Sequence, residues 1–423
     1  MNKNFFFHAL IFMKDKIKKT KLGFIISYLK YLISRFVISQ KYKSYYTYKS
    51  ILVSKIHVEN SNFFGYYNIT PNNNNDEIIF LSVRNQFKRG SLIESAKIML
   101  KIKNSKPFQI SQTHSWNWQQ GCMLQWLGKK GDLIIFNDYD NASNKYYSKI
   151  INTKGDLIRK FEMPINNVNK KGDFALCLNY ERLAIYRPDY GYFNKKESKL
   201  LKDEDDGIWS LNLLTGEIKL IISIEKLKDL KYSETMNEAI HKVNHLEINP
   251  IGNRFIFLHR WIGPKGRYTR LISANIDGTE IFILNGDKMT SHCCWINESE
   301  IISFCFIENY GNAYYRFIDK SHIVNKISDN LPLIDGHPSV SNDNQWMIID
   351  TYPDKSRMSN LYLYNFLNDR IIKIGEFYQP LKYDGELRID LHPKWDYNSK
   401  NVFFESGHEK NRNLFRINLS EIL

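Results

Sequence analysis

The sequence has little of what defines several common classes of protein. Its five cysteines, Cys122, Cys177, Cys293, Cys294 and Cys305, are odd in number, lie within apolar runs and show no CxxC spacing. They are typical of reduced core residues in a cytoplasmic protein, and they exclude a disulfide framework as the basis of the fold. No zinc-finger, RNA-recognition or helix-turn-helix pattern appears, so we do not expect nucleic acid as a partner.

Acidic residues are also in deficit. The chain has 45 Asp and Glu against 59 Lys and Arg, which gives a formal net charge of +14. This balance favours an anionic partner such as lipid or an acidic glycan, although a solvated surface rich in lysine would produce the same count. The 26 Tyr, 26 Phe and 8 Trp residues exclude a disordered chain and favour β-strands.

No long uninterrupted hydrophobic run is present near the start of the chain. The apolar run Phe5–Met13 lacks a small-residue cleavage site and leads into a lysine-rich segment, and residues 23–38 are too interrupted by charge to span a bilayer. Residues 1–50 carry eleven Lys or Arg and one acid, Asp15. We expect a basic amphipathic extension that contacts an anionic membrane, placing the protein in the cytoplasm at the periphery of the inner membrane; the alternative is a helix packed against the rest of the chain.

The remainder, residues 51–423, contains a repeat. An apolar strand, a turn rich in Asn, Asp or Gly and two further strands recur seven times, at intervals of roughly 45 to 70 residues. The repeats open at residues 64–71, 120–126, 174–179, 244–250, 291–295, 336–341 and 391–395. This pattern predicts an all-β fold, a seven-bladed β-propeller with a basic N-terminal helical extension. The segment Ser50–Glu59 would add an outer strand to the last blade and close the ring.

Four histidines share one position in successive repeats: His245, His292, His337 and His392. Because the first strand of each blade lines the central channel, these side chains should converge in one funnel. Neutral imidazoles suit a divalent transition metal such as Mn, Zn, Ni or Fe, and Asp335 or Asp390 could complete the ligand set. A histidine outside the ligand set could act as a general base. The alternative is that each histidine only caps its own strand.

Other polar and aromatic residues fall close to these openings. Arg187, Tyr190 and Arg260 are candidate catalytic residues, because Arg and Tyr can neutralise a carboxylate and move protons in a β-elimination. Candidate substrate-binding residues are Tyr66, Trp116, Gln120 and Tyr192. All of them could equally be ordinary rim residues.

Three segments resemble a known family. Asn244-His245-Leu246 with Asn249-Pro250, Ser291-His292 with Trp295, and Gly336-His337-Pro338-Ser339 are similar to the seven-bladed propeller polysaccharide lyases of the oligogalacturonate lyase type, and more broadly to TolB-like propellers. The resemblance implies a divalent metal, typically manganese, held by His292 and His337, with His245 as base and an arginine beside the substrate carboxylate. His392 and Asp390 are added as ligands from their expected place in the funnel.

The expected function is therefore metal-assisted β-elimination of an acidic, uronate-containing oligosaccharide or polysaccharide, in a setting such as surface-polysaccharide metabolism. The alternative is a non-catalytic propeller that binds a glycan or protein partner at the membrane surface. Fold alone cannot separate the two, because propellers host both.

Overall fold

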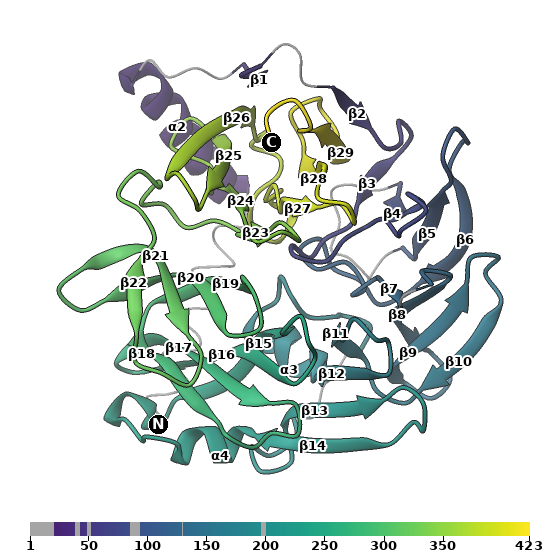
Figure 1. The fold of residues 1–423 in the computed structure, drawn as a ribbon, viewed down its shortest axis with the longest axis vertical. Helices are drawn as coiled ribbons and strands as arrows, with labels where there is room; N and C mark the ends of the chain where they lie inside the picture. Colours follow the sequence, from purple (N-terminus) through teal and green to yellow (C-terminus); the bar gives the residue numbers. More distant parts are fainter. Residues whose placement is uncertain (1–20, 39–42, 49–51, 85–93, 129, 196–199) are drawn as a thin grey trace.

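The strands form seven antiparallel sheets arranged as blades around a central axis (Figure 1). The structure is a computed structural model, and it describes residues 21–38, 43–48, 52–84, 94–128, 130–195 and 200–423. The predicted seven-bladed β-propeller is confirmed. The run Phe5–Met13 lies outside the described residues.

In every blade the second and third strands are longer than the inner strand. The first three blades are β3 (Ser61–Phe63), β4 (Ile78–Val83), β5 (Ala96–Lys101) and β6 (Phe108–Thr113); β7 (Gln125–Leu127), β8 (Leu133–Asp140), β9 (Lys145–Asn152) and β10 (Leu157–Phe161); and β11 (Ile165–Val168), β12 (Phe174–Leu178), β13 (Gly207–Asn212) and β14 (Ile218–Ser223). The next two are β15 (Ile240–Ile248), β16 (Arg254–Gly263), β17 (Gly266–Asn275) and β18 (Phe282–Lys288); and β19 (Thr290–Trp295), β20 (Glu300–Ile307), β21 (Gly311–Ile318) and β22 (Val324–Lys326). The sixth is β23 (Ser339–Val340), β24 (Trp346–Asp350), β25 (Met358–Asn365) and β26 (Arg370–Tyr378), and the seventh contains β27 (Lys394–Trp395), β28 (Asn401–Ser406) and β29 (Asn413–Asn418).

Two strands from the start of the chain complete the last two blades. The strand β2 (Val53–Lys55) pairs with β29 in antiparallel register, which confirms the predicted ring closure. The strand β1 (Tyr45–Tyr46) pairs with β26 and becomes the fifth strand of the sixth blade. Residues of the predicted extension therefore belong in part to the propeller sheets.

Helices are few in the described part of the chain. They are α2 (Lys21–Ile38), α3 (Tyr180–Tyr186), α4 (Ile224–Asp229) and the 3₁₀ turns η1 (Glu234–Met236) and η2 (Gly385–Leu387). The helix α3 begins at Asn179, whose side chain accepts hydrogen bonds from the backbone N–H groups of Glu181 and Arg182. Among the described helices none combines the length and apolar character needed to cross a membrane.

Second strands carry the core. All residues of β4, β24 and β28 are buried, because each sheet packs against a neighbouring blade on both of its faces. Such strands appear in the sequence as unbroken apolar runs. The five cysteines are buried and unpaired within this core.

Two predicted blade openings were wrong for the same reason. The segment Phe174–Leu178 is the second strand of the third blade, and the inner strand is Ile165–Val168. In the first blade the inner strand is Ser61–Phe63, and residues 64–70 form the loop that follows it. Both inner strands are short and contain Asn, so the more apolar segment that follows each of them was taken for the blade opening.

Candidate metal and active site

The four predicted histidines meet on the propeller axis. The ring centroids of His292 and His337 lie 3.9 Å apart, those of His337 and His392 4.3 Å apart, and those of His245 and His292 5.4 Å apart. All four side chains are buried. The blades therefore bring together residues that are nearly 150 positions apart in the sequence, as the repeat register predicted.

Local backbone irregularities direct these side chains into the channel. His245 and His292 each sit where the pairing register of an inner strand shifts, between Asn244 and Glu247 in β15 and between Thr290 and Cys293 in β19. His245 and His392 have positive φ angles of 54° and 44°. Bulges and left-handed backbone at non-glycine residues cost free energy and are enriched at functional sites, because they re-aim side chains.

A tyrosine not predicted as a site residue stands at the centre of the cluster. The ring of Tyr67 lies 5.6 Å from His292, 5.1 Å from His337, 6.2 Å from His245 and 6.3 Å from His392. Its hydroxyl donates to the carbonyl oxygen of Cys293, 3.1 Å away. Tyr67 thus forms the floor that the four imidazoles share, and its place in the Tyr66-Tyr67 pair after the first inner strand was the available signal.

Carboxylates orient two of the imidazoles. Asp350 Oδ1 accepts hydrogen bonds from the backbone N–H of His337 at 2.7 Å and from its Nδ1 at 2.9 Å, while Asp350 Oδ2 accepts from the backbone N–H of His392 at 3.0 Å. His292 Nδ1 lies 3.1 Å from Asp335 Oδ1. A carboxylate on Nδ1 fixes the tautomer and leaves Nε2 free to bind a metal, which is the arrangement found around metal-binding histidines.

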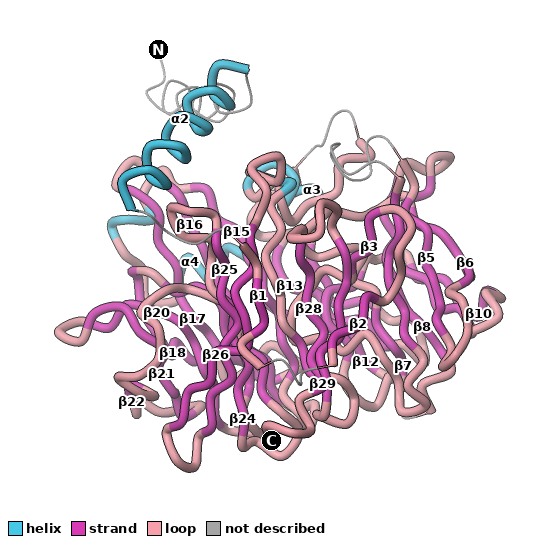
Figure 2. The backbone as a smooth tube through the Cα atoms, turned by 90° about the horizontal axis from the view of Figure 1, so that it is seen from above, coloured by secondary structure: helices cyan, strands magenta, loops and turns pink. Residues whose placement is uncertain are grey.

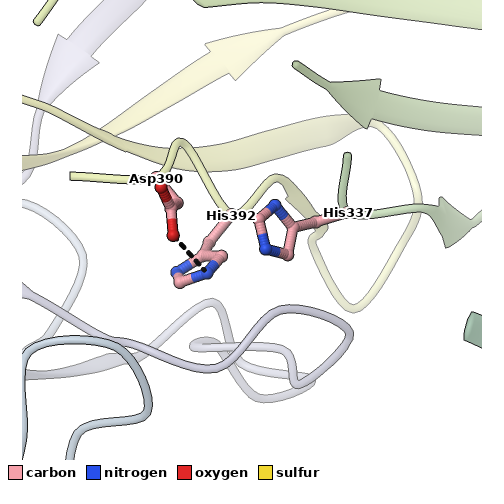
Figure 3. A group of neighbouring side chains, drawn as sticks. All are labelled: His337, Asp390 and His392. Atoms are coloured by element: carbon pink, nitrogen blue, oxygen red, sulfur yellow. Dashed lines mark ion pairs between the residues drawn. The ribbon is translucent and has the colours of Figure 1, made fainter. Parts of the chain in front are cut away.

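Three side chains could hold a cation directly. One ligand atom from each of His337, Asp390 and His392 lies within 4.8 Å of the others (Figure 3). His337 Nε2, His392 Nδ1 and Asp390 Oδ1 are buried and have no hydrogen-bond partner among the described residues. Unpaired buried polar atoms are costly, and each of these three residues carries one in addition to the His392 Nε2 and Asp390 Oδ2 atoms that face each other at 3.9 Å. A mixed imidazole and carboxylate cluster of this kind suits a divalent ion.

Burial sets the protonation of the imidazoles. It lowers the pKa of His392, His245 and His292, and the neighbouring histidines and arginines lower these pKa values further. Burial also opposes the charged form of His337, but the charge and hydrogen bond of Asp350 outweigh it and raise the pKa of His337. Three of the four rings are therefore neutral at neutral pH, the state that a metal ligand or a general base requires.

His245 differs from the other three in its surroundings. Its Nδ1 lies 3.1 Å from the hydroxyl of Tyr66, and its Nε2 is buried without a partner among the described residues. The ring of Tyr190 meets it edge-on at 5.4 Å. The predicted base and the predicted Tyr66 and Tyr190 are thus in contact.

A cationic wall beside His245 is formed by Arg187, Lys242 and Arg260. The guanidinium of Arg187 lies over the ring of Tyr190 and pairs with Asp189, and Lys242 and Arg260 are opposed on the paired strands β15 and β16. Burial, together with Arg187 and Arg260, lowers the pKa of Lys242 to about 7. The wall therefore favours an anion over a further cation.

Arg388, which was not among the predicted site residues, joins this wall to the candidate metal ligands. It donates to Asp189 Oδ2 at 2.7 Å and to Asp390 Oδ2 at 2.8 Å. The alternation Arg388-Ile389-Asp390-Leu391-His392 places every second residue on one face, and this period of two could have revealed it.

Other predicted substrate-binding residues have different surroundings. Trp116 packs against Phe63 and Trp118 and donates its Nε1 hydrogen to the carbonyl oxygen of Glu94, and Tyr192 stacks on Tyr180 at 4.3 Å. Both lie in the hydrophobic core, because aromatic residues near a blade opening also fill the space between blades. The side-chain amide of Gln120 is buried, and neither its nitrogen nor its oxygen has a partner among the described residues.

The fold and this site define a seven-bladed propeller with a histidine and carboxylate cluster on its axis. Solved structures of the same architecture include an oligogalacturonate lyase from Vibrio parahaemolyticus, with a TM-score of 0.61 and 12% identity over 89% of this chain and 96% of that one. A second, an oligogalacturonate lyase in complex with manganese, has a TM-score of 0.58 and 12% identity over the same shares. A hydrazine synthase from Kuenenia stuttgartiensis has a TM-score of 0.50 and 7% identity, over 85% of this chain and 96% of that one.

No protein-family model and no curated protein matches the sequence. The structural likeness therefore establishes the fold alone, since at 7–12% identity the same fold is found in oligogalacturonate lyases and in a hydrazine synthase. The chemistry of this chain has to be argued from its own residues.

Proposed function

We propose that this protein is a metal-assisted lyase that cleaves an acidic, uronate-containing oligosaccharide or polysaccharide by β-elimination. The observation that carries the proposal is the buried cluster of His337, His392 and Asp390, in which one ligand atom of each residue lies within 4.8 Å of the others. Each of the three also has a buried polar atom without a hydrogen-bond partner among the described residues. The cationic wall beside them and the manganese complex of an oligogalacturonate lyase with the same fold support it.

The residues divide into two groups. His337, His392 and Asp390 would hold the ion, with His292 beside them through its ring contact with His337. Manganese fits this mixed imidazole and carboxylate set, as do zinc, nickel and iron. A bound divalent ion would supply Lewis-acid polarisation of the substrate carboxylate.

The chain's own groups account for the remaining chemistry. Arg187, Arg260 and Arg388 attract the uronate carboxylate, and Tyr66 orients His245 through Nδ1. His245 Nε2 removes the proton α to that carboxylate, the electron pair forms the ring double bond, and the glycosidic C–O bond breaks. The leaving oxygen takes a proton from an acid, for which Tyr190 is the candidate because it contacts His245.

The test starts with metal content. Protein purified without chelator is measured by elemental analysis beside the variant His292→Ala, His337→Ala, His392→Ala, with His57→Ala, His322→Ala as a control outside the funnel. About one equivalent of metal in the wild type and the control, absent from the triple variant, is the expected result. Oligogalacturonate and other uronate oligosaccharides are then screened for an unsaturated product that absorbs in the ultraviolet.

A wild type that folds but takes up no manganese, zinc, nickel or iron overturns the proposal. The protein would then be better explained as a propeller that binds a glycan or protein without cleaving it, the alternative expected from the sequence.

A further inference from the structure

The helix α2 presents one apolar face that the propeller does not cover. Its exposed apolar residues recur at positions i, i+3, i+4, i+7, i+10 and i+11, the spacing of a single helical face. Their exposed fractions range from 42% to 62%, for Leu22, Ile25, Ile26, Leu29, Leu32 and Ile33. In Figure 2 the helix rises above the ends of the strands, and its lower end lies beside the loops of the blades.

The charge on this segment indicates what covers that face. The helix contains Lys21, Lys30 and Arg35 and no acidic residue, and Lys30 is exposed. Residues 1–50 together carry eleven basic residues and one acid. A second copy of the same helix would bring like charges together, whereas an anionic lipid surface accepts both the apolar face and the cations.

The position of α2 also fixes which side of the ring would meet that surface. In an antiparallel blade, the start of the inner strand and the loop between the second and third strands lie at the same side of the ring. His337 and His392 directly precede β23 and β27, and α3 lies between β12 and β13, so all of them belong to this side. Figure 2 shows α2 and α3 rising from this same side.

We propose that α2 lies in the interface of an anionic membrane, with its apolar face in the lipid, and holds the side of the propeller that carries His337 and His392 toward that membrane. The proposal does not depend on the lyase reaction. Combined with that reaction, it implies a substrate presented close to the bilayer. The basic residues add electrostatic attraction to an anionic surface, and this attraction falls with ionic strength.

The first experiment measures binding to vesicles by flotation. Vesicles of phosphatidylcholine alone are compared with vesicles that also contain phosphatidylglycerol, at low and high salt. The variant Leu29→Asp, Ile33→Asp removes apolar character from α2, and Leu214→Asp, Leu367→Asp is the matched control, because these two exposed leucines lie in turns at the opposite side of the ring. Thermal unfolding checks that both variants fold.

We expect the wild type to bind the anionic vesicles and high salt to weaken this binding. The α2 variant should bind at least tenfold more weakly, whereas the control variant should bind as well as the wild type. Equal binding by wild type and α2 variant overturns the proposal. So does a wild-type dimer, seen by light scattering, that the α2 variant dissociates while neither protein binds vesicles.

The second experiment tests the orientation. Lys355 and Leu367 are exposed and flank the two ends of β25, so single Lys355→Cys and Leu367→Cys variants place a fluorophore on either side of the ring. The five native cysteines are buried, which keeps the labelling selective. Energy transfer to an acceptor-labelled lipid should be stronger from position 355; equal transfer, or stronger transfer from 367, overturns the orientation.

Discussion

Asp350 holds His337 through two hydrogen bonds to one carboxylate oxygen, one from the backbone N–H at 2.7 Å and one from Nδ1 at 2.9 Å. Gly336 makes this approach sterically acceptable, since a Cβ atom there would lie 1.9 Å from the carbonyl oxygen of Asp350. The second carboxylate oxygen holds the backbone of His392. One buried aspartate therefore positions two candidate metal ligands from adjacent blades.

Replacing this carboxylate should weaken metal binding without removing a ligand. In Asp350→Asn one acceptor oxygen becomes an NH₂ group that faces a donor, so His337 loses its fixed tautomer. We expect roughly a 10- to 100-fold loss of metal affinity, measured by competition with a chromogenic chelator. Asp329→Asn, at an exposed site, is the control, and unchanged affinity in Asp350→Asn would show that the carboxylate does not orient the ligand.

Replacing His245, the proposed base, should separate the proposed chemistry from metal binding. Gln at position 245 can still accept a hydrogen bond from Tyr66 but cannot take the substrate proton. His245→Gln should therefore keep its metal while the rate of product formation falls by about 10² to 10⁴, followed by ultraviolet absorbance. Full activity in this variant would assign the base to another residue.

The buried carboxylate of Glu405 joins the last blade to the first. Glu405 accepts hydrogen bonds from the backbone N–H groups of Phe64 at 3.1 Å and Gly65 at 2.6 Å, and it pairs with buried Arg412 at 3.2 Å. Glu405→Ala leaves the Arg412 charge without its carboxylate, so the free energy of unfolding should fall by about 3–5 kcal/mol in urea titration. Glu421→Ala, on the surface, should change it by less than about 0.5 kcal/mol.

Stability at low pH should depend on Asp138. Burial raises its pKa, but Lys149, 2.8 Å away, and backbone N–H groups outweigh burial and hold the pKa below its usual value. The folded state therefore binds fewer protons, and this stability is present above the unfolded pKa of about 3.9 and lost as pH falls below it.

The melting temperature of the wild type should decline with acidification more steeply than that of Asp138→Asn, followed by circular dichroism at a series of pH values. Parallel curves for the two proteins would mean that Asp138 has the same pKa folded and unfolded.

The architecture and the convergence of the histidines on the axis could be predicted from the sequence, because both depend on short-range patterns. Apolar runs mark the buried second strands, and the shared register of His245, His292, His337 and His392 brings their side chains together on the axis. The role of Tyr67 could not be predicted in this way, since its contacts with four blades exist only after the ring closes.

The residues that hold the candidate metal ligands in place could not be predicted, for a similar reason. Asp350 is the last residue of β24, a second strand whose other residues are apolar and buried. Arg388 pairs with Asp189, which lies almost 200 residues earlier in the chain. Conversely, Trp116 and Tyr192 show that an aromatic residue near a blade opening can serve the core.

The pairing of β2 with β29 has a consequence for biosynthesis. The seventh blade joins a strand from near residue 54 to strands from residues 394–418, so it cannot form until almost the whole propeller has left the ribosome. Earlier blades can collapse in order during translation, but the ring stays open with an unpaired edge until that final pairing. Closing so long a loop is slow, and a nascent chain stalled before β29 would expose the edge of β28 to other chains.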